Sequence, residues 1–278
     1  MSVWFITGCS TGLGRALAEA VLDRGHQAAV TARDPAAVTD LVDAHLGRAL
    51  ALALDVTDDQ QVRAAVRAAE ERFGGVDVLV NNAGYGYRAA VEEGEDDAVA
   101  ALFDTHVNGA VRTIRAVLPG MRGRRSGSIV NLSSIGARVS PEGSGYYAAA
   151  KAAVEALTLS LRKEVGPLGI TATAVEPGAF RTDFAGRSLT QAAEPIADYA
   201  DTAGRRRLEH DTAHGKQPGD PAKAAAALVD VVESGRAPYL LVLGNDAVDA
   251  VRDSLAALAG DVDAWEPTSR STDLGRER

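Results

Sequence analysis

The sequence predicts an α/β protein with a doubly wound sheet of seven parallel strands and helices on both faces. Short apolar runs alternate along the chain with longer alanine-rich segments of helical period, which is typical of βαβ units. Right-handed crossovers between such units place ligands beyond the carboxyl ends of the strands, where the winding direction reverses. With 278 residues, 46% of them hydrophobic, the chain can bury one large core, and we expect a single domain over residues 1–260.

A glycine-rich loop joins the first strand, expected over residues 3–7, to a helix expected over 12–24. Glycines let a backbone approach a pyrophosphate closely, and the free N–H groups of the following helix favour an anion. Three residues separate the first two glycines, where the common dinucleotide fingerprint has one, so a tight turn without a ligand is the alternative. The residues that we expect to bind phosphate are Gly8, Ser10, Thr11, Gly12, Leu13 and Gly14.

The second strand, expected over 27–32, ends where the ribose of a dinucleotide would lie. An acidic residue there would bind the 2'-hydroxyl of NAD, whereas an arginine pairs with the 2'-phosphate of NADP. Ala32 followed by Arg33 therefore favours NADP(H) over NAD(H). Asp34 would serve NAD instead if the strand ended one residue later.

The third and fourth strands, expected over 49–55 and 77–81, lead into a second motif, Asn81-Asn82-Ala83-Gly84. Together with the glycine loop, this run resembles the short-chain dehydrogenase/reductase family, whose fold is of the Rossmann type. The resemblance assigns the adenosine side of the dinucleotide to Asp55, Val56, Asn82, Ala83 and Gly84. As an alternative, Asp55 would cap the helix expected over 58–73.

Tyr147 and Lys151 lie four residues apart in a helix expected over 147–165, so their side chains share one helical face. A free tyrosine has a pKa of about 10, and an adjacent ammonium group lowers it by favouring the phenolate. We therefore expect Lys151 to lower the pKa of Tyr147 for proton transfer. Tyr146 competes less well because Ala150 stands four residues after it.

Ser134 follows the fifth strand, expected over 128–132, and precedes Tyr147 by thirteen residues, which is the family's spacing for its active-site serine. The resemblance implies that Ser134 steadies the substrate oxygen while Tyr147 exchanges a proton with it and hydride passes between the nicotinamide and the substrate carbon. It also implies a hydrogen bond from Lys151 to the nicotinamide ribose. The neighbouring Ser133 is expected to pack against the sheet.

One position departs from the family pattern. The family carries an asparagine three residues before a glycine in the helix that precedes the fifth strand, and here His106 stands before Gly109. His106 could hold a relay water, fill a polar place in the core, or weaken the activity, and these alternatives stay open. Asn108 lies on a different helical face and cannot simply replace it.

The sixth strand, expected over 170–175, leads into the segment that resembles the family's contact with the nicotinamide carboxamide, at Pro177, Gly178 and Thr182. For Pro177 and Gly178, the alternative is a plain turn at the end of the strand, with no ligand contact. We expect a substrate lid at about 183–221, the seventh strand at 239–243 and a frayed polar tail at 261–278. The apolar lid or core residues are Phe184, Leu189, Ile196 and Tyr199.

Composition narrows the class of partner. The net charge of -9 is spread along the chain and offers no basic surface for nucleic acid. The N-terminal apolar run is short and lacks a basic leader, so we expect neither a signal peptide nor a membrane span. Cys9, the single cysteine, fits a reducing compartment and a cytoplasmic protein. By resemblance to the family, we expect a homodimer or homotetramer.

The leading functional hypothesis is an NADPH-dependent carbonyl reductase or the reverse alcohol dehydrogenase. The pattern from Thr7 to Thr182 most resembles the hydroxysteroid and retinol dehydrogenase-like branch of the family. The apolar residues of the lid predict an uncharged, largely apolar substrate. Two alternatives stay open: a non-catalytic dinucleotide-binding sensor or scaffold, and an epimerase that retains its cofactor.

Overall fold

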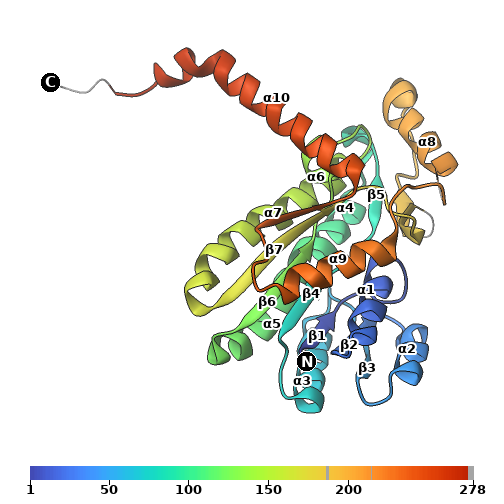
Figure 1. Cartoon of the computed structure of the whole chain (residues 1–278). Coiled ribbons are helices and arrows are strands. Elements are labelled where there is room, and N and C mark those ends of the chain that lie inside the picture. The colour runs from blue at the N-terminus through green and yellow to red at the C-terminus, as the bar shows by residue number, and fades with distance from the viewer. Residues whose placement is uncertain (186–187, 214, 275–278) are drawn as a thin grey trace.

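The computed structural model describes residues 1–185, 188–213 and 215–274, without the side chains of residues 185 and 210–213. Its main sheet has seven parallel strands in the order β3-β2-β1-β4-β6-β7-β9 (Figure 1), which confirms the predicted fold class. The strands are β1 (Val3–Ile6), β2 (Gln27–Ala32), β3 (Ala49–Ala53), β4 (Val78–Asn81), β6 (Gly127–Leu132), β7 (Ile170–Pro177) and β9 (Leu240–Leu243).

Helices cover both faces of this sheet, and the central strand β1 shows why. Its residues are buried on both sides: Trp4 and Ile6 pack into one hydrophobic core and Phe5 into the other. A strand buried on both faces needs a continuous apolar run, which Val-Trp-Phe-Ile supplies. The first core contains residues of α1 (Gly12–Asp23) and α9 (Pro221–Glu233), and the second contains residues of α3 (Asp59–Phe73), α5 (Gly109–Arg124) and α7 (Gly145–Val165).

The winding direction reverses at β1, which pairs with β2 on one side and with β4 on the other. The loops that follow β1 and β4 therefore leave the same edge of the sheet next to each other. Thr7 links them, because its backbone N–H donates to the carbonyl of Val80 at 3.0 Å. This edge is the place where a doubly wound sheet binds its ligands.

A second, two-stranded sheet was not predicted. β5 (Gly86–Arg88) pairs in parallel with β8 (Leu189–Gln191), and three residues are too few to show a strand period in the sequence. β8 belongs to the expected lid, whose residues 186, 187 and 214 lie outside the described residues.

The remaining elements are α2 (Thr39–Ala44), α4 (Asp96–Phe103), α6 (Gly136–Val139), α8 (Arg205–Ala213), the short turns η1 (Pro35–Val38), η2 (Val91–Glu93), η4 (Gly166–Leu168), η5 (Asp183–Ala185) and η6 (Ala197–Tyr199), and the π-helical turns η3 (Asp104–Asn108) and η7 (Ala200–Gly204).

The described part of the lid is anchored to the body by two carboxylates, the buried Glu93 and the exposed Glu95. Glu93 accepts a hydrogen bond from the backbone N–H of Ile196 at 2.9 Å, and Glu95 accepts one from Ala193 at 2.8 Å. Arg207 of α8 forms an ion pair with the same Glu93. These contacts hold residues 193–207 against the start of α4.

The prediction of a frayed tail from residue 261 was wrong. The last helix, α10 (Asn245–Arg270), continues to Arg270 and projects away from the body (Figure 1). Residues 255–265 contain strong helix formers, mainly alanine and leucine, and these outweigh the single Gly260. All described residues beyond Arg270, up to Leu274, are exposed, and all except Leu274 are polar. Residues 275–278 of the predicted tail lie outside the described residues.

Candidate active site

The glycine loop approaches the strand beside it so closely that two of its glycines admit no side chain. Gly8 has a φ of +73°, and a Cβ there would lie 2.9 Å from the Cα of Ala83. A Cβ on Gly14 would overlap the amide of Asn82 and the carbonyl of Gly8. The side chain of Thr11, at the N-terminus of α1, makes no capping hydrogen bond to the first turn of the helix. Thr11 therefore leaves the N–H groups of this first turn without a side-chain partner, which suits the predicted binding of an anion.

The asparagine motif after β4 braces this loop. The side-chain amide of Asn82 donates to the carbonyls of Thr7 and Gly8, at 2.9 Å each. In return, the Thr7 hydroxyl accepts the backbone N–H groups of Asn82 and Ala83, also at 2.9 Å. Four hydrogen bonds therefore fix the two loops relative to each other at the carboxyl edge of the sheet.

At the end of the sheet predicted to bind adenosine, the acidic residues differ in their contacts. β2 ends at Ala32, Arg33 is exposed, and Asp34 accepts the backbone N–H of Ala36 at 3.0 Å. Asp58, not Asp55, caps α3, so the alternative proposed for Asp55 is wrong.

Asp55 forms a local turn instead. Its carboxylate accepts the backbone N–H of Thr57 at 2.9 Å and the hydroxyl of the same residue at 2.6 Å. Val56, next in the chain, is buried and lies against Gly109. The Asp55-Val56 pair thus lies at the end of β3 with its backbone held in a fixed turn.

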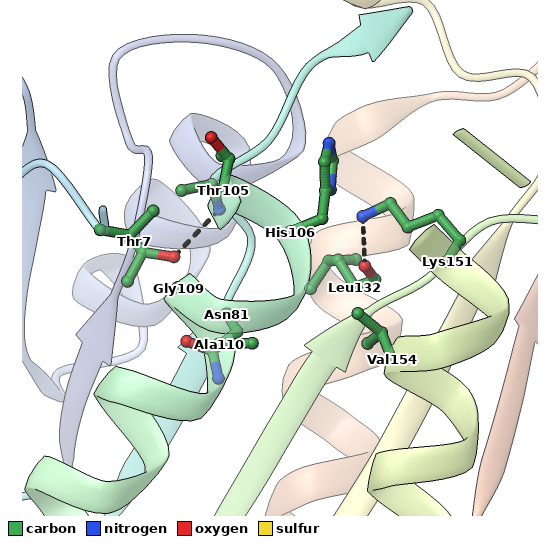
Figure 2. Close-up of a pocket in the computed structure, with 11 residues that line it drawn as sticks. Thr7, Asn81, Thr105, His106, Gly109, Ala110, Leu132, Lys151 and Val154 are labelled. Carbon is green, nitrogen blue, oxygen red and sulfur yellow. Dashed lines mark hydrogen bonds between the residues drawn. The ribbon is translucent and has the colours of Figure 1, made fainter. Parts of the chain in front are cut away.

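Tyr147, Lys151 and Ser134 come together at the carboxyl end of β6. Tyr147 and Lys151 lie on one face of α7, with the Lys151 ammonium nitrogen 5.7 Å from the centroid of the Tyr147 ring. The Lys151 ammonium donates to the carbonyl of Leu132 at 2.6 Å (Figure 2). The Ser134 hydroxyl accepts the backbone N–H of Gly136 at 3.0 Å and lies, with the ring of Tyr147, beside Gly136. Tyr146 turns away, because its hydroxyl donates to the carbonyl of Val91.

The expected effect of Lys151 on Tyr147 is not found in this structure. Burial raises the pKa of Tyr147 to about 12, and the nearby hydroxyl of Ser134 opposes the rise only in part. Burial also lowers the pKa of Lys151 to about 7, against the attraction of Glu155. The ammonium group bonds to a backbone carbonyl and does not contact the phenol oxygen, so desolvation decides both shifts.

A pocket opens beside Lys151 at the edge of the sheet. Figure 2 shows its walls, which come from the ends of β1, β4 and β6 and from α5 and α7. Its lining residues are Thr7, Val56, Asn81, Ala83, Thr105, His106, Gly109, Ala110, Leu132, Lys151 and Val154.

The segment after β7 closes the other side of the site. Thr182 lies across from the glycine loop, with its Cβ 3.6 Å from the position of a Cβ on Gly12. Gly178 lies against the carboxylate of Asp246, which accepts the backbone N–H of Ala179 at 2.8 Å. The ring of Phe184 stands 5.7 Å from that of Tyr147, between centroids. The structure therefore brings the predicted end of β7 and one predicted lid residue to the site.

Comparison with known proteins identifies this arrangement. The family model described as short chain dehydrogenase matches residues 2–193. The chain belongs to the short-chain dehydrogenase family. The resemblance inferred from the glycine loop, the asparagine motif and the Tyr147 helix is thereby confirmed. As a member of this family, the protein is an oxidoreductase with a fold for a nicotinamide dinucleotide.

Relatives of this short-chain dehydrogenase match most of its length. Oxidoreductase BOA17 of Botryotinia fuckeliana is 38% identical over 268 residues, covering 96% of this chain and 97% of the relative. A 3-ketodihydrosphingosine reductase of Bacteroides thetaiotaomicron is 34% identical, with 86% of each chain covered. The crystal structure of a short-chain dehydrogenase from Streptomyces avermitilis superposes with a TM-score of 0.92 at 43% identity, covering 98% of this chain and 100% of that one.

His106 is the residue in which this short-chain dehydrogenase departs from the family pattern. It lies in the π-helical turn η3, and its Nε2 bonds to the carbonyl of Tyr85 at 2.7 Å. Its ring meets that of Tyr147 edge-on, 5.6 Å between centroids. Burial and the nearby charge of Lys151 lower the pKa of His106 to about 3, so the ring is neutral at physiological pH. Asn108 is exposed and donates to Asp104, away from the site.

A buried charged cluster behind Ser134 was not predicted from the sequence. Arg138 of α6 bonds to Glu155 of α7 and to Glu176 of β7, at 2.8 Å each. The hydroxyl of Ser133 donates to Glu155 at 2.5 Å, so Ser133 is not simply packed against the sheet. Burial and the neighbouring Glu176 carboxylate raise the pKa of Glu155 to about 7. Oε2 of Glu176 is buried without a hydrogen-bond partner among the described residues, and a proton on Glu155 would supply one.

Proposed function

We propose that this protein is an NADP(H)-dependent carbonyl reductase, with Tyr147 as the group that exchanges a proton with the substrate oxygen. The observation that carries the proposal is the convergence of Tyr147, Lys151 and Ser134 at the carboxyl edge of the sheet, beside the glycine loop. The glycine loop fits a dinucleotide because a side chain on Gly8 or Gly14 would fill the backbone cradle.

A bound nicotinamide would supply or accept a hydride at the substrate carbon. The chain's own residues handle the oxygen. A phenol whose pKa burial raises to about 12 holds its proton at neutral pH, so Tyr147 is suited to donate it to a carbonyl oxygen in the reducing direction. Ser134 holds a second hydroxyl at the same point, where it can stabilise charge that develops on that oxygen. Phe184 shields the phenol from water on the lid side.

Arg33 supports the choice of NADP(H). β2 ends at Ala32, which puts no acid at the strand end, and Asp34 is occupied with the turn that follows. Solved relatives from Brucella melitensis and Burkholderia phymatum, 25% and 26% identical, were crystallised with NADH and NAD. The preference therefore needs a direct test. We expect Arg33→Ala to weaken NADPH binding about tenfold or more and to leave NADH binding unchanged.

The substrate is proposed to be an uncharged, largely apolar carbonyl compound, because apolar lid side chains lie at the site. The ring of Phe184 faces Tyr147, and Leu189 and Phe184 both lie against Gly86. Of the other predicted lid residues, Tyr199 donates its hydroxyl to Glu92, away from Tyr147, and Ile196 is half-buried. Among the described residues, no helix is both long and apolar enough to cross a membrane. A cytoplasmic location and a homodimer or homotetramer stay predictions from the sequence.

The decisive experiment follows NADPH oxidation with a panel of apolar ketones and aldehydes. We expect Tyr147→Phe to lose a factor of about 10²–10⁴ in kcat while still binding NADPH. Tyr146→Phe is the matched control, because its hydroxyl bonds to a loop carbonyl, and it should keep most of the rate. Unchanged turnover in Tyr147→Phe would refute the assignment. A wild type that binds NADPH without net oxidation of it would favour the sensor or the epimerase instead.

A further inference from the structure

The last helix, α10, carries an apolar stripe with the spacing of a coiled coil. Its apolar residues recur at alternating intervals of three and four, which is the spacing of the two core positions in a heptad repeat. A stripe of this kind needs a second helix to cover it, because one helix alone leaves it in water. The stripe consists of Val248, Val251, Leu255, Leu258, Val262 and Trp265.

Only the start of this stripe is covered by the body of the protein. Val251 is buried, and the hydroxyl of Ser254 donates to the carbonyl of Arg138 at 3.3 Å. Every described residue from 255 onward is exposed, and Figure 1 shows this part of the helix projecting into solvent. The exposed fractions of the four outer stripe residues are 51% for Leu255, 55% for Leu258, 68% for Val262 and 65% for Trp265.

The opposite face of α10 is built for solvent. Asp253, Gly260 and Pro267 recur every seven residues and lie opposite the stripe. Glycine and proline weaken a helix, and both fall on the face that needs no packing partner. The large apolar side chains are therefore confined to one face over the whole projecting part.

The charge of the helix argues against a lipid surface as the cover. Residues 245–270 contain six acidic and two basic residues, whereas helices that lie on anionic membranes are rich in lysine and arginine. A helix with the same heptad spacing matches the stripe best, and a second copy of this chain supplies one.

We propose that the α10 helices of two copies pair antiparallel along residues 252–266, an overlap of about 20 Å. In this register Leu258 packs against Val262 of the second copy, and Leu255 packs against its Trp265. The antiparallel direction places Arg252 opposite Glu266 of the other copy, twice per pair. The same register also brings the two Asp261 residues together once, near the centre of the overlap. A parallel pair would instead place Asp261 beside Glu266 twice, with no opposite charges to offset the repulsion, so the antiparallel direction is favoured. The two bodies then lie at opposite ends of the paired helices.

Disulfide trapping tests the register directly. Wild type carries only Cys9, which is buried, so introduced cysteines are the reactive ones. Leu258→Cys and Val262→Cys, each alone, should form little disulfide-linked dimer, and a mixture of the two should form it readily, because only unlike positions face each other. Ala257→Cys mixed with Ala264→Cys, both on the outer face, is the matched control and should stay monomeric on a non-reducing gel. Dimers from either single stripe variant alone would overturn the antiparallel pairing, as would the absence of dimers from the mixture.

Light scattering supplies a second measurement. We expect Leu258→Asp to weaken the pairing of the two α10 helices at least about tenfold and so to lower the molar mass in solution. Ala257→Asp should leave the mass unchanged. Both residues are exposed in the projecting part, so the Tm of each variant should match that of wild type. An unchanged mass for Leu258→Asp would overturn the proposal. Neither measurement depends on the proposed reductase activity, so the two proposals can fail separately.

Discussion

The cluster of Arg138, Glu155 and Glu176 predicts how the stability of this protein changes with pH. Two carboxylates share one arginine in a buried place, and Glu155 keeps a proton to higher pH than a free glutamate does. Between pH 4.5 and about 7 the unfolded chain releases this proton while the folded chain holds it. Wild-type stability therefore falls as the pH rises through this window. The pKa change corresponds to at most about 3 kcal/mol, and the proton belongs to the carboxylate pair as a whole.

Glu155→Gln isolates this contribution. The amide cannot ionise, and its NH₂ group can donate to the unpartnered oxygen of Glu176 as a protonated carboxyl would. We expect the free energy of unfolding of the variant, relative to wild type, to increase by up to about 3 kcal/mol between pH 5 and pH 8. Comparing the variant with wild type at each pH cancels other titrating groups, such as His106, whose effect has the opposite sign.

The assay is urea unfolding at a series of pH values, with Glu164→Gln as the control. Glu164 is an exposed carboxylate on the same helix and accepts a hydrogen bond from Ser160. Its replacement should shift the unfolding free energy by a small amount that hardly varies with pH. If the difference between Glu155→Gln and wild type is the same at pH 5 and pH 8, the cluster does not hold a proton and the reasoning fails.

Two further predictions concern the glycine loop and the buried histidine. Gly14→Ala should lose about 1–3 kcal/mol of stability and weaken dinucleotide binding, because the new Cβ overlaps the amide of Asn82. Gly123→Ala is the control: no atom lies near its Cβ, so it should gain up to about 1 kcal/mol. Equal stability of the two variants in thermal unfolding would contradict this. His106→Asn should lose less stability in acid than wild type does, because a histidine whose pKa is lowered to about 3 destabilises the folded state as the pH falls below 6.5. The measurement is the free energy of unfolding of both proteins as a function of pH. Two curves that stay parallel down to low pH would count against the prediction.

The parts of the fold that repeat along the chain could be predicted from the sequence, and the parts that depend on distant contacts could not. The seven strands of the main sheet were predicted because each carries an apolar run bounded by turns, as β1 does at Val3–Ile6. β5 and β8 were missed because their pairing joins residues about a hundred positions apart. The α10 stripe was visible in the sequence, but the many acidic residues around it favoured a frayed tail.

The same limit applies to the site. The spacing of Tyr147 and Lys151 predicts that they share a helical face, and the structure agrees. The sign of the pKa change on Tyr147 could not be predicted, because it depends on burial by residues such as Phe184 and His106, from other elements. The Glu155 cluster joins α6, α7 and β7. No local pattern marks these residues as neighbours, and only the i, i+4 relation of Glu155 to Lys151 offered a signal.

The central place of β1 has a consequence for how the protein is made. This strand is synthesised about seventy residues before its second neighbour, β4, which begins at Val78. One side of a very apolar strand therefore waits for about seventy residues of synthesis, which takes several seconds. During that time the edge of β1 that later pairs with β4 lacks its partner strand, and a chaperone that holds apolar segments can bind there.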